Sequence, residues 1–297
     1  MRVIPGDICL VRWVDYGQDL RPELLKICRD HLGLNDPLFS QFLHFIKGVF
    51  TFDLGLSMWT ERPIIEELKL RFALSLQVAI LATLVSILFA IPLGVLSAVK
   101  QNTWIDYAVR IISIAGVAVP SFWLGILIIL GLLISSQTLF GEPWMPPIVY
   151  VSPLVDPIAN LSQLIWPVIA IGYRYTSVAT RMTRSVLLDI LREDYIRTAR
   201  AKGLLENLVV NRHALRNALL PVVTIIGMEF SFLMGGLVVT EQVFNLNGLG
   251  RLMFESVLNS DYNMTQALVM ICVLMFVGIN FLIDLFYAWL DPRIRYG

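Results

Sequence analysis

The sequence has few of the residues from which catalytic and metal sites are usually built. Only three histidines and three cysteines occur among its 297 residues. The cysteines, Cys9, Cys28 and Cys272, show no CxxC spacing, so we interpret them as ordinary apolar cysteines and expect neither a metal nor a redox cofactor. No phosphate-binding loop of the GxxxxGK[ST] type occurs, which excludes ATP hydrolysis by that route.

Net charge is also absent, because 23 basic and 23 acidic residues cancel. The composition therefore gives no reason to expect a nucleic-acid partner. Residues 1–30 carry charges throughout and lack the apolar core of a signal peptide. Apolar residues are abundant instead: the chain is 57% hydrophobic and 15% charged, with a mean hydropathy of +0.71. Such values are too apolar for a soluble domain of this length and indicate a membrane protein.

Five stretches are long and apolar enough to cross a bilayer core of about 30 Å, which needs roughly 20 helical residues. Their ranges are 72–99, 111–141, 161–180, 218–240 and 263–283. Three of them contain no charged residue, while the third contains Arg174 and the fourth contains Glu229. The predicted fold is an all-α, polytopic membrane helical bundle with five spans in this chain.

The distribution of basic residues predicts the orientation. Arginine and lysine are concentrated in the loop 181–217, whereas residues 142–160 contain neither. Because Lys and Arg in short loops stay on the cytoplasmic side, we place loop 181–217 inside and residues 142–160 outside. The transmembrane domain then covers 72–290 and is followed by a cytoplasmic tail, 291–297. Residues 1–71 become an extracytoplasmic segment with no apolar stretch before it to drive export, so we expect a further span upstream.

Several motifs, in order along the chain, resemble one transporter family. The predicted cytoplasmic loop contains DYIRTARAKG at 194–203, followed by RHALRNALLPVVT at 212–224. With VPSFWLGI at 119–126 and DPRIRY at 291–296, these resemble the inner-membrane permeases of ABC importers for dipeptides, oligopeptides and nickel. The resemblance implies a core of six spans, with a motif like the PGD at 5–7 just after the first, and a permease function for peptides or related small solutes.

The resemblance further implies that the cytoplasmic loop couples the chain to an ATPase. Apolar residues at helical spacing predict a short amphipathic helix whose apolar face contains Leu188, Leu191, Tyr195 and Ala199. Gly203 is expected to end this helix, and Glu193 and Arg197 to form a surface pair. The expected coupling residues are Tyr195, Arg197, Ala199 and Gly203. A basic loop held by anionic membrane lipid is the alternative interpretation.

The expected partners are those of an importer subunit: two ATPase subunits, a second permease subunit, an extracytoplasmic solute-binding protein and membrane lipid. We expect no enzymatic activity in the chain itself. The alternative function is a stand-alone secondary transporter or channel with Glu229 or Asp284 as a proton relay, although no inverted repeat is visible. An intramembrane enzyme is disfavoured because His31, His44 and His213 lie outside the predicted spans.

The two charged residues inside predicted spans need an explanation, because an ionisable side chain is costly to bury in a bilayer. Arg174 and Glu229 lie at similar depths in spans that are antiparallel and consecutive along the chain. We expect them to pair or to line the solute path together. The alternative is that Arg174 reaches the cytoplasmic interface while Glu229 faces a polar cavity.

Overall fold

The computed structural model describes residue 9 and residues 22–31, 35–51 and 53–290. Within these ranges the chain is built from helices, and the only β pairing is an isolated bridge between Leu56 and Pro63. The predicted tail at 291–297 and the PGD motif at 5–7 lie outside the described residues.

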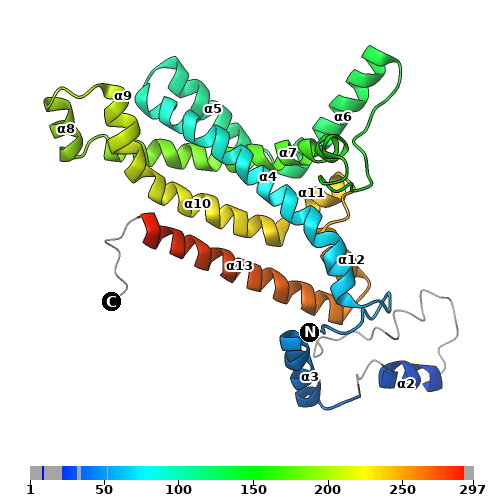
Figure 1. The fold of residues 1–297 in the computed structure, drawn as a ribbon. Helices are drawn as coiled ribbons and strands as arrows, with labels where there is room; N and C mark the ends of the chain where they lie inside the picture. Colours follow the sequence, from blue (N-terminus) through cyan, green and yellow to red (C-terminus); the bar gives the residue numbers. More distant parts are fainter. Residues whose placement is uncertain (1–8, 10–21, 32–34, 52, 291–297) are drawn as a thin grey trace. The chain divides into compact units, whose positions relative to one another are not determined.

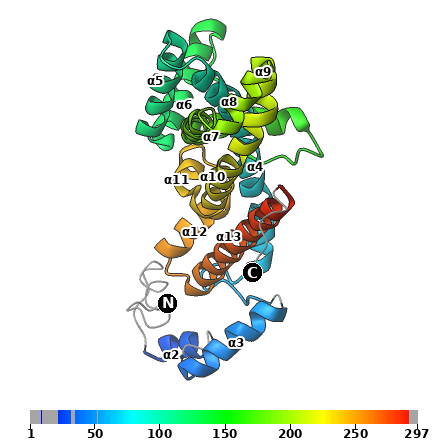
Figure 2. The ribbon, with the colours of Figure 1, turned by 90° about the vertical axis from the view of Figure 1, so that its left-hand side faces the viewer.

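The chain divides into two compact units, which are described separately. The first comprises Met1–Ser75 and Asn247–Leu274, and the second comprises Leu76–Leu246 and Met275–Gly297. Figure 1 labels the helices, and Figure 2 shows them from a second direction. Their bounds are α2 Pro22–His31, α3 Leu38–Thr51, α4 Ile64–Val99, α5 Trp104–Ala118, α6 Ser121–Phe140, α7 Pro157–Ile190, α8 Asp194–Ala201, α9 Glu206–Leu208, the π-helix η1 Val209–Ala214, α10 Leu215–Gly236, α11 Val238–Val243, α12 Leu249–Leu258 and α13 Tyr262–Leu290.

Four helical segments in the described part of the chain are long and apolar enough to cross a membrane. They are Ile64–Val99, Ser121–Phe140, Glu206–Gly235 and Tyr262–Leu285. Only 11% of the most apolar window in α6 and 6% of that in α13 are buried inside this chain. Helices with such exposed apolar surfaces suit a lipid environment or a subunit interface. The predicted membrane helical bundle is confirmed.

Helix α7 is the predicted span that differs from these four. It is 34 residues long, yet it buries polar residues such as Asn160, Gln163 and Thr180 within its unit. Helices α5, α6 and α10 all pack against it. Its lower hydropathy therefore reflects a position inside the bundle, where protein rather than lipid surrounds its side chains.

Small residues bring the backbones of α4 and α5 close to α7. A Cβ atom added at Gly94 would lie 2.5 Å from the Cβ of Thr183, and one added at Gly116 would lie 2.1 Å from the Oγ of Ser177. Such distances leave no room for a side chain at either glycine. Close helix approach through small residues is a common way to pack membrane helices.

The predicted span 111–141 is not one continuous helix. Helix α5 ends at Ala118, and α6 begins at Ser121 after an extended Val119 and Pro120. The break has a local cause, because proline lacks the backbone N–H and forces the preceding residue out of the helical region. The predicted span is thus interrupted at Pro120, and α6 alone is long and apolar enough to cross a membrane.

In the first unit, the buried carboxylate of Asp261 fixes a tight turn to the start of α13. The Oγ of Ser57 donates a hydrogen bond to Asp261. The backbone N–H groups of Met58 and Trp59 donate to the same carboxylate at 3.1 and 3.2 Å. The N–H of Met264, in the first turn of α13, donates at 3.0 Å. One side chain thus caps a helix and holds the turn in place.

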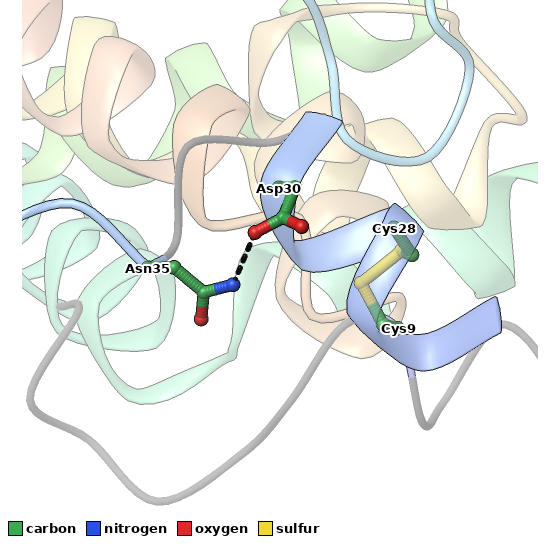
Figure 3. The surroundings of a disulfide bond; sticks show 4 residues. All are labelled: Cys9, Cys28, Asp30 and Asn35. Carbon is green, nitrogen blue, oxygen red and sulfur yellow. Dashed lines mark hydrogen bonds between the residues drawn. A yellow bond between two sulfur atoms is a disulfide. The ribbon is translucent and has the colours of Figure 1, made fainter. Parts of the chain in front are cut away.

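Cys9 and Cys28 form a disulfide beside this turn, with their Cα atoms 6.1 Å apart (Figure 3). Cys9 is fully buried in a small apolar cluster with Met58, against which Trp59 packs. The interpretation of these two cysteines as ordinary apolar residues is therefore wrong. Sequence spacing could not reveal the bond, because it does not show which distant segments meet.

Candidate functional site

Helix α8 lies in the predicted cytoplasmic loop and ends where the sequence predicts. Gly203 follows it with a φ of +76°, in the left-handed region that favours glycine. The N–H of Gly203 donates to the carbonyl of Arg200 at 2.9 Å, and the N–H of Leu204 donates to that of Ala199 at 3.4 Å. This pair of bonds is a Schellman motif. The predicted helix stop is confirmed.

Helix α8 buries Ile196 and Ala199, whose side chains are 0% and 9% exposed. They join an apolar cluster with Leu187 at the end of α7 and Ala218 near the start of α10. The cluster also contains Ala98, Val209 and Ala214. Because residues from three long helical segments meet here, displacement of α8 would shift the packing of α4, α7 and α10 together.

The predicted apolar face of the loop is only partly correct. Tyr195 is 42% exposed, and its hydroxyl accepts a hydrogen bond from the Nδ2 of Asn217 at 2.8 Å. Ile196 takes the buried position instead. One helical spacing does not continue across residues 191–193, because α7 ends at Ile190 and α8 begins at Asp194, and this turn brings Ile196 to the buried side.

Charged groups cover the outward side of α8. Arg197 pairs with Asp194 rather than with the predicted Glu193, which occupies the N-cap position. Arg200 forms a bidentate pair with Glu206, with nitrogen–oxygen distances of 3.1 and 2.7 Å. These side chains are exposed, so their ion pairs add little to stability. Tyr195, Arg197 and their neighbours therefore form an accessible polar face above a buried apolar base.

A buried ion pair, which the sequence analysis did not identify, lies next to this base. Asp106, in the first turn of α5, is 0% exposed. Its carboxylate accepts hydrogen bonds from the Nε and Nη2 of Arg184 at 2.7 and 2.8 Å, from the Oγ of Ser97 at 2.6 Å and from the N–H of Asn102 at 3.0 Å. We call these four residues the Asp106 clamp.

The Asp106 clamp joins α4, α5 and α7 at one level. The hydrogen bonds from Arg184, with further ones from Ser97 and Asn102, hold the pKa of the Asp106 carboxyl well below its usual range despite its burial. Ser97 precedes Ala98, and Arg184 lies one turn before Leu187, so the clamp and the base of α8 share the same helix ends.

Arg174 and Glu229 lie on α7 and α10, which pack together. The two charges are near enough to interact electrostatically, but they form no ion pair in the described structure. One carboxylate oxygen of Glu229 is buried and has no hydrogen-bond partner. The guanidinium of Arg174 lies 5.9 Å from the centre of the Tyr175 ring. The direct pair is not formed in this conformation, and a shared role in the solute path stays a prediction.

Comparisons with known proteins fit this arrangement of helices. Residues 90–296 match the family of binding-protein-dependent transport system inner membrane components. The chain belongs to this family. It is 38% identical over 297 residues to the glutathione transport system permease protein GsiC of Escherichia coli K12, covering 100% of this chain and 91% of the relative. It is 35% identical over 302 residues to the dipeptide transport system permease protein DppB of Alkalihalophilus pseudofirmus, covering 94% and 88%.

Solved structures of ABC transporters have the same fold as this family member. The inward-facing MetNI methionine ABC transporter aligns with a TM-score of 0.58 and 16% identity, over 76% of this chain and 97% of the other. An amino acid ABC transporter solved with histidines aligns with a TM-score of 0.52 and 17% identity, over 82% and 96%. The chain is thus a multi-pass ABC importer permease, as its motifs indicate.

Proposed function

We propose that this permease carries peptides or related small solutes and that α8 is its contact with an ATPase subunit. The glutathione and dipeptide permeases among its relatives support the solute class. The observation that carries the coupling role is the two-sided character of α8. Ile196 and Ala199 anchor it to the membrane helices, while Tyr195 and Arg197 remain exposed to a partner. A helix this short is marginal alone, and the buried apolar base holds α8 in place so that its polar face can meet a partner.

The proposed complex contains two ATPase subunits, a second permease subunit and an extracytoplasmic solute-binding protein. The chain supplies no ATP chemistry of its own in this proposal, which fits its lack of a phosphate-binding loop. The loop 181–217 lies in the cytoplasm, and residues 1–71 lie outside. The disulfide supports that orientation, since disulfides persist in oxidising compartments and are rare in the cytoplasm.

In the proposed mechanism, closure of the ATPase dimer moves α8 and with it the membrane helices. The apolar base passes the movement to α4, α7 and α10, and the Asp106 clamp keeps α4, α5 and α7 in register. ATP binding then favours an outward-facing state and hydrolysis an inward-facing one. Both states of the permease must be close in free energy. The free energy that drives transport comes from ATP in the partner subunits.

Co-purification in mild detergent tests this function. The tagged permease should bring an ATPase with it, and the double variant Tyr195→Ala, Arg197→Glu should release that ATPase while the permease still folds. Lys100→Gln, which changes an exposed basic residue in the turn between α4 and α5, should retain it. Solute uptake in the absence of any ATPase would overturn the proposal and favour a secondary transporter.

A further inference from the structure

An open groove of about 770 Å³ lies between α5, α7 and α10 in the second unit. Three arginines line it: Arg110 from α5, with Arg181 and Arg184 from α7. Aliphatic side chains, among them Ile114 and Ile225, form part of the remaining wall. No carboxylate lines this groove in the described structure.

The groove carries positive charge that this chain does not neutralise. Arg184 is bound to Asp106 and is therefore compensated. Arg110 and Arg181 are exposed and form no ion pair among the described residues. The guanidinium of Arg110 lies 5.8 Å from the centre of the Tyr107 ring, a contact that leaves its charge uncompensated. Two guanidinium groups are thus available to an anion.

The α7 wall of the groove continues toward Arg174, deeper in the bundle. Arg174, Val178, Arg181 and Ser185 recur at helical spacing and share one face of α7. On α10, Ile225 lies one turn from Glu229. A solute that entered beside Arg174 and Glu229 would therefore pass along one line of side chains to Arg181, about 10 Å farther along α7.

We propose that this groove is the cytoplasmic part of the solute path and that Arg181 and Arg110 bind the carboxylate of the solute there. The inference rests on the proposed function and orientation. Guanidinium groups bind carboxylates with two parallel hydrogen bonds. Both arginines are exposed in this chain, and exposed charge pairs are weak, which suits a site that must release its ligand. The groove selects against solutes without an acidic group.

A lipid phosphate would satisfy the same two arginines, but the arrangement favours a solute. A phospholipid headgroup at the cytoplasmic interface would meet these two arginines but not Arg174 and Glu229, which lie deeper in the bundle. A peptide has a carboxylate and an amine, which complement the arginines of the groove and Glu229 on α10, respectively. The experiment below separates the two sources of the anion.

The test uses the purified permease and ATPase complex without its binding protein or nucleotide. N-acetyl-trialanine carries a carboxylate and no amine, whereas trialanine amide carries an amine and no carboxylate. We expect the first peptide to raise the Tm in a saturable manner and the second to raise it far less. Arg181→Gln and Arg110→Gln should each raise the concentration of N-acetyl-trialanine needed for half of the maximal Tm shift by about tenfold. This is the loss of affinity expected for one charged hydrogen-bonded contact. Lys100→Gln is the control and should respond like the parent chain.

Three outcomes would overturn the proposal: equal stabilisation by both peptides, an unchanged response in both arginine variants, or stabilisation by added phosphatidylglycerol but by neither peptide. Arg181→Lys keeps the positive charge and should recover part of the response, which separates loss of binding from loss of folding. Co-purification of the ATPase is measured on the same samples. Failure of the groove with retained ATPase would leave the proposed function standing.

Discussion

A buried aspartate joins distant segments in each unit, but the two sites are built differently. Asp106 is paired with a cation, Arg184, and also accepts a hydrogen bond from Ser97. Asp261 receives hydrogen bonds from a serine hydroxyl and from backbone N–H groups, and a disulfide lies in the same unit. The Asp106 site is held by an ion pair. The Asp261 site is held by uncharged hydrogen-bond donors, with a covalent crosslink nearby.

The difference shows how each region tolerates the loss of one contact. Removing one partner of a buried ion pair leaves the other charge without compensation, which is strongly unfavourable. Removing an acceptor of backbone N–H groups leaves neutral donors, which are less costly and which water can reach when they are partly buried. The Asp106 clamp should therefore be the more fragile of the two, and the following changes test that ranking.

Loss of the Asp106 clamp should have the largest effect. Asp106→Ala leaves Arg184 unpaired and should lower the free energy of unfolding by about 3–5 kcal/mol, with a large fall in Tm or in permease yield. Asp156→Asn is a matched control, because Asp156 caps α7 from an exposed position and asparagine caps helices equally well. A Tm equal to that of the parent chain would contradict the role assigned to the clamp.

The clamp also predicts how the stability depends on pH. A carboxyl whose folded pKa lies below its unfolded value contributes stability that is complete above the unfolded pKa and is lost as the pH falls through the folded pKa. Because Arg184 depresses the pKa of Asp106, the contribution of the clamp should stay constant from neutral pH down to mildly acidic pH. In Asp106→Asn the contribution of the clamp should be absent throughout that range. The difference in Tm between the parent chain and this variant should therefore not change with pH.

Opening the disulfide should have a smaller effect, confined to the first unit. The cysteines are separated by 19 residues, and closing a loop of that size contributes about 3 kcal/mol. The double variant Cys9→Ser, Cys28→Ser should increase proteolysis of the first unit while the ATPase still co-purifies. After mild reduction of intact cells, a membrane-impermeant maleimide should label the parent chain and not the variant. A lack of labelling would contradict the extracytoplasmic assignment.

The sequence revealed the features that depend on local composition. Apolar stretches, the excess of arginine in one loop and the glycine at the end of α8 are each visible within a short window, and the structure has the corresponding helices and the helix stop. The break at Pro120 also has a local signal, because proline disfavours the helical region for the residue before it.

Contacts between distant segments could not be derived in this way. Arg184 and Asp106 are 78 residues apart, and Ser57 and Asp261 are 204 apart. No periodicity or spacing connects such pairs, because their meeting depends on how whole helices pack. The disulfide between Cys9 and Cys28 has the same character. Ile196 was missed for a different reason, since a turn of a few residues changed the phase of the helical pattern.

Removing single hydrogen bonds at Asp261 should cost less again. Asp261→Asn keeps one carbonyl oxygen as acceptor and should lower the free energy of unfolding by about 1–2 kcal/mol, measured as a modest fall in Tm. Ser57→Ala removes only the hydroxyl donor and should cost about 1 kcal/mol. If Asp261→Asn destabilised the chain as much as Asp106→Ala, the contrast between uncharged donors and an ion pair would be wrong.

The smallest effect on stability should come from the exposed face of α8, where stability and coupling separate. Arg197 and Asp194 are 72% and 88% exposed, and such pairs contribute about 0–1 kcal/mol. Arg197→Gln should therefore leave the Tm almost unchanged and still reduce the amount of ATPase that co-purifies. Ile196→Ala should do the reverse at the base, lowering the Tm by removing a buried side chain while leaving the exposed face intact. Equal effects of both variants on both measurements would mean that α8 has no separate anchoring and docking faces.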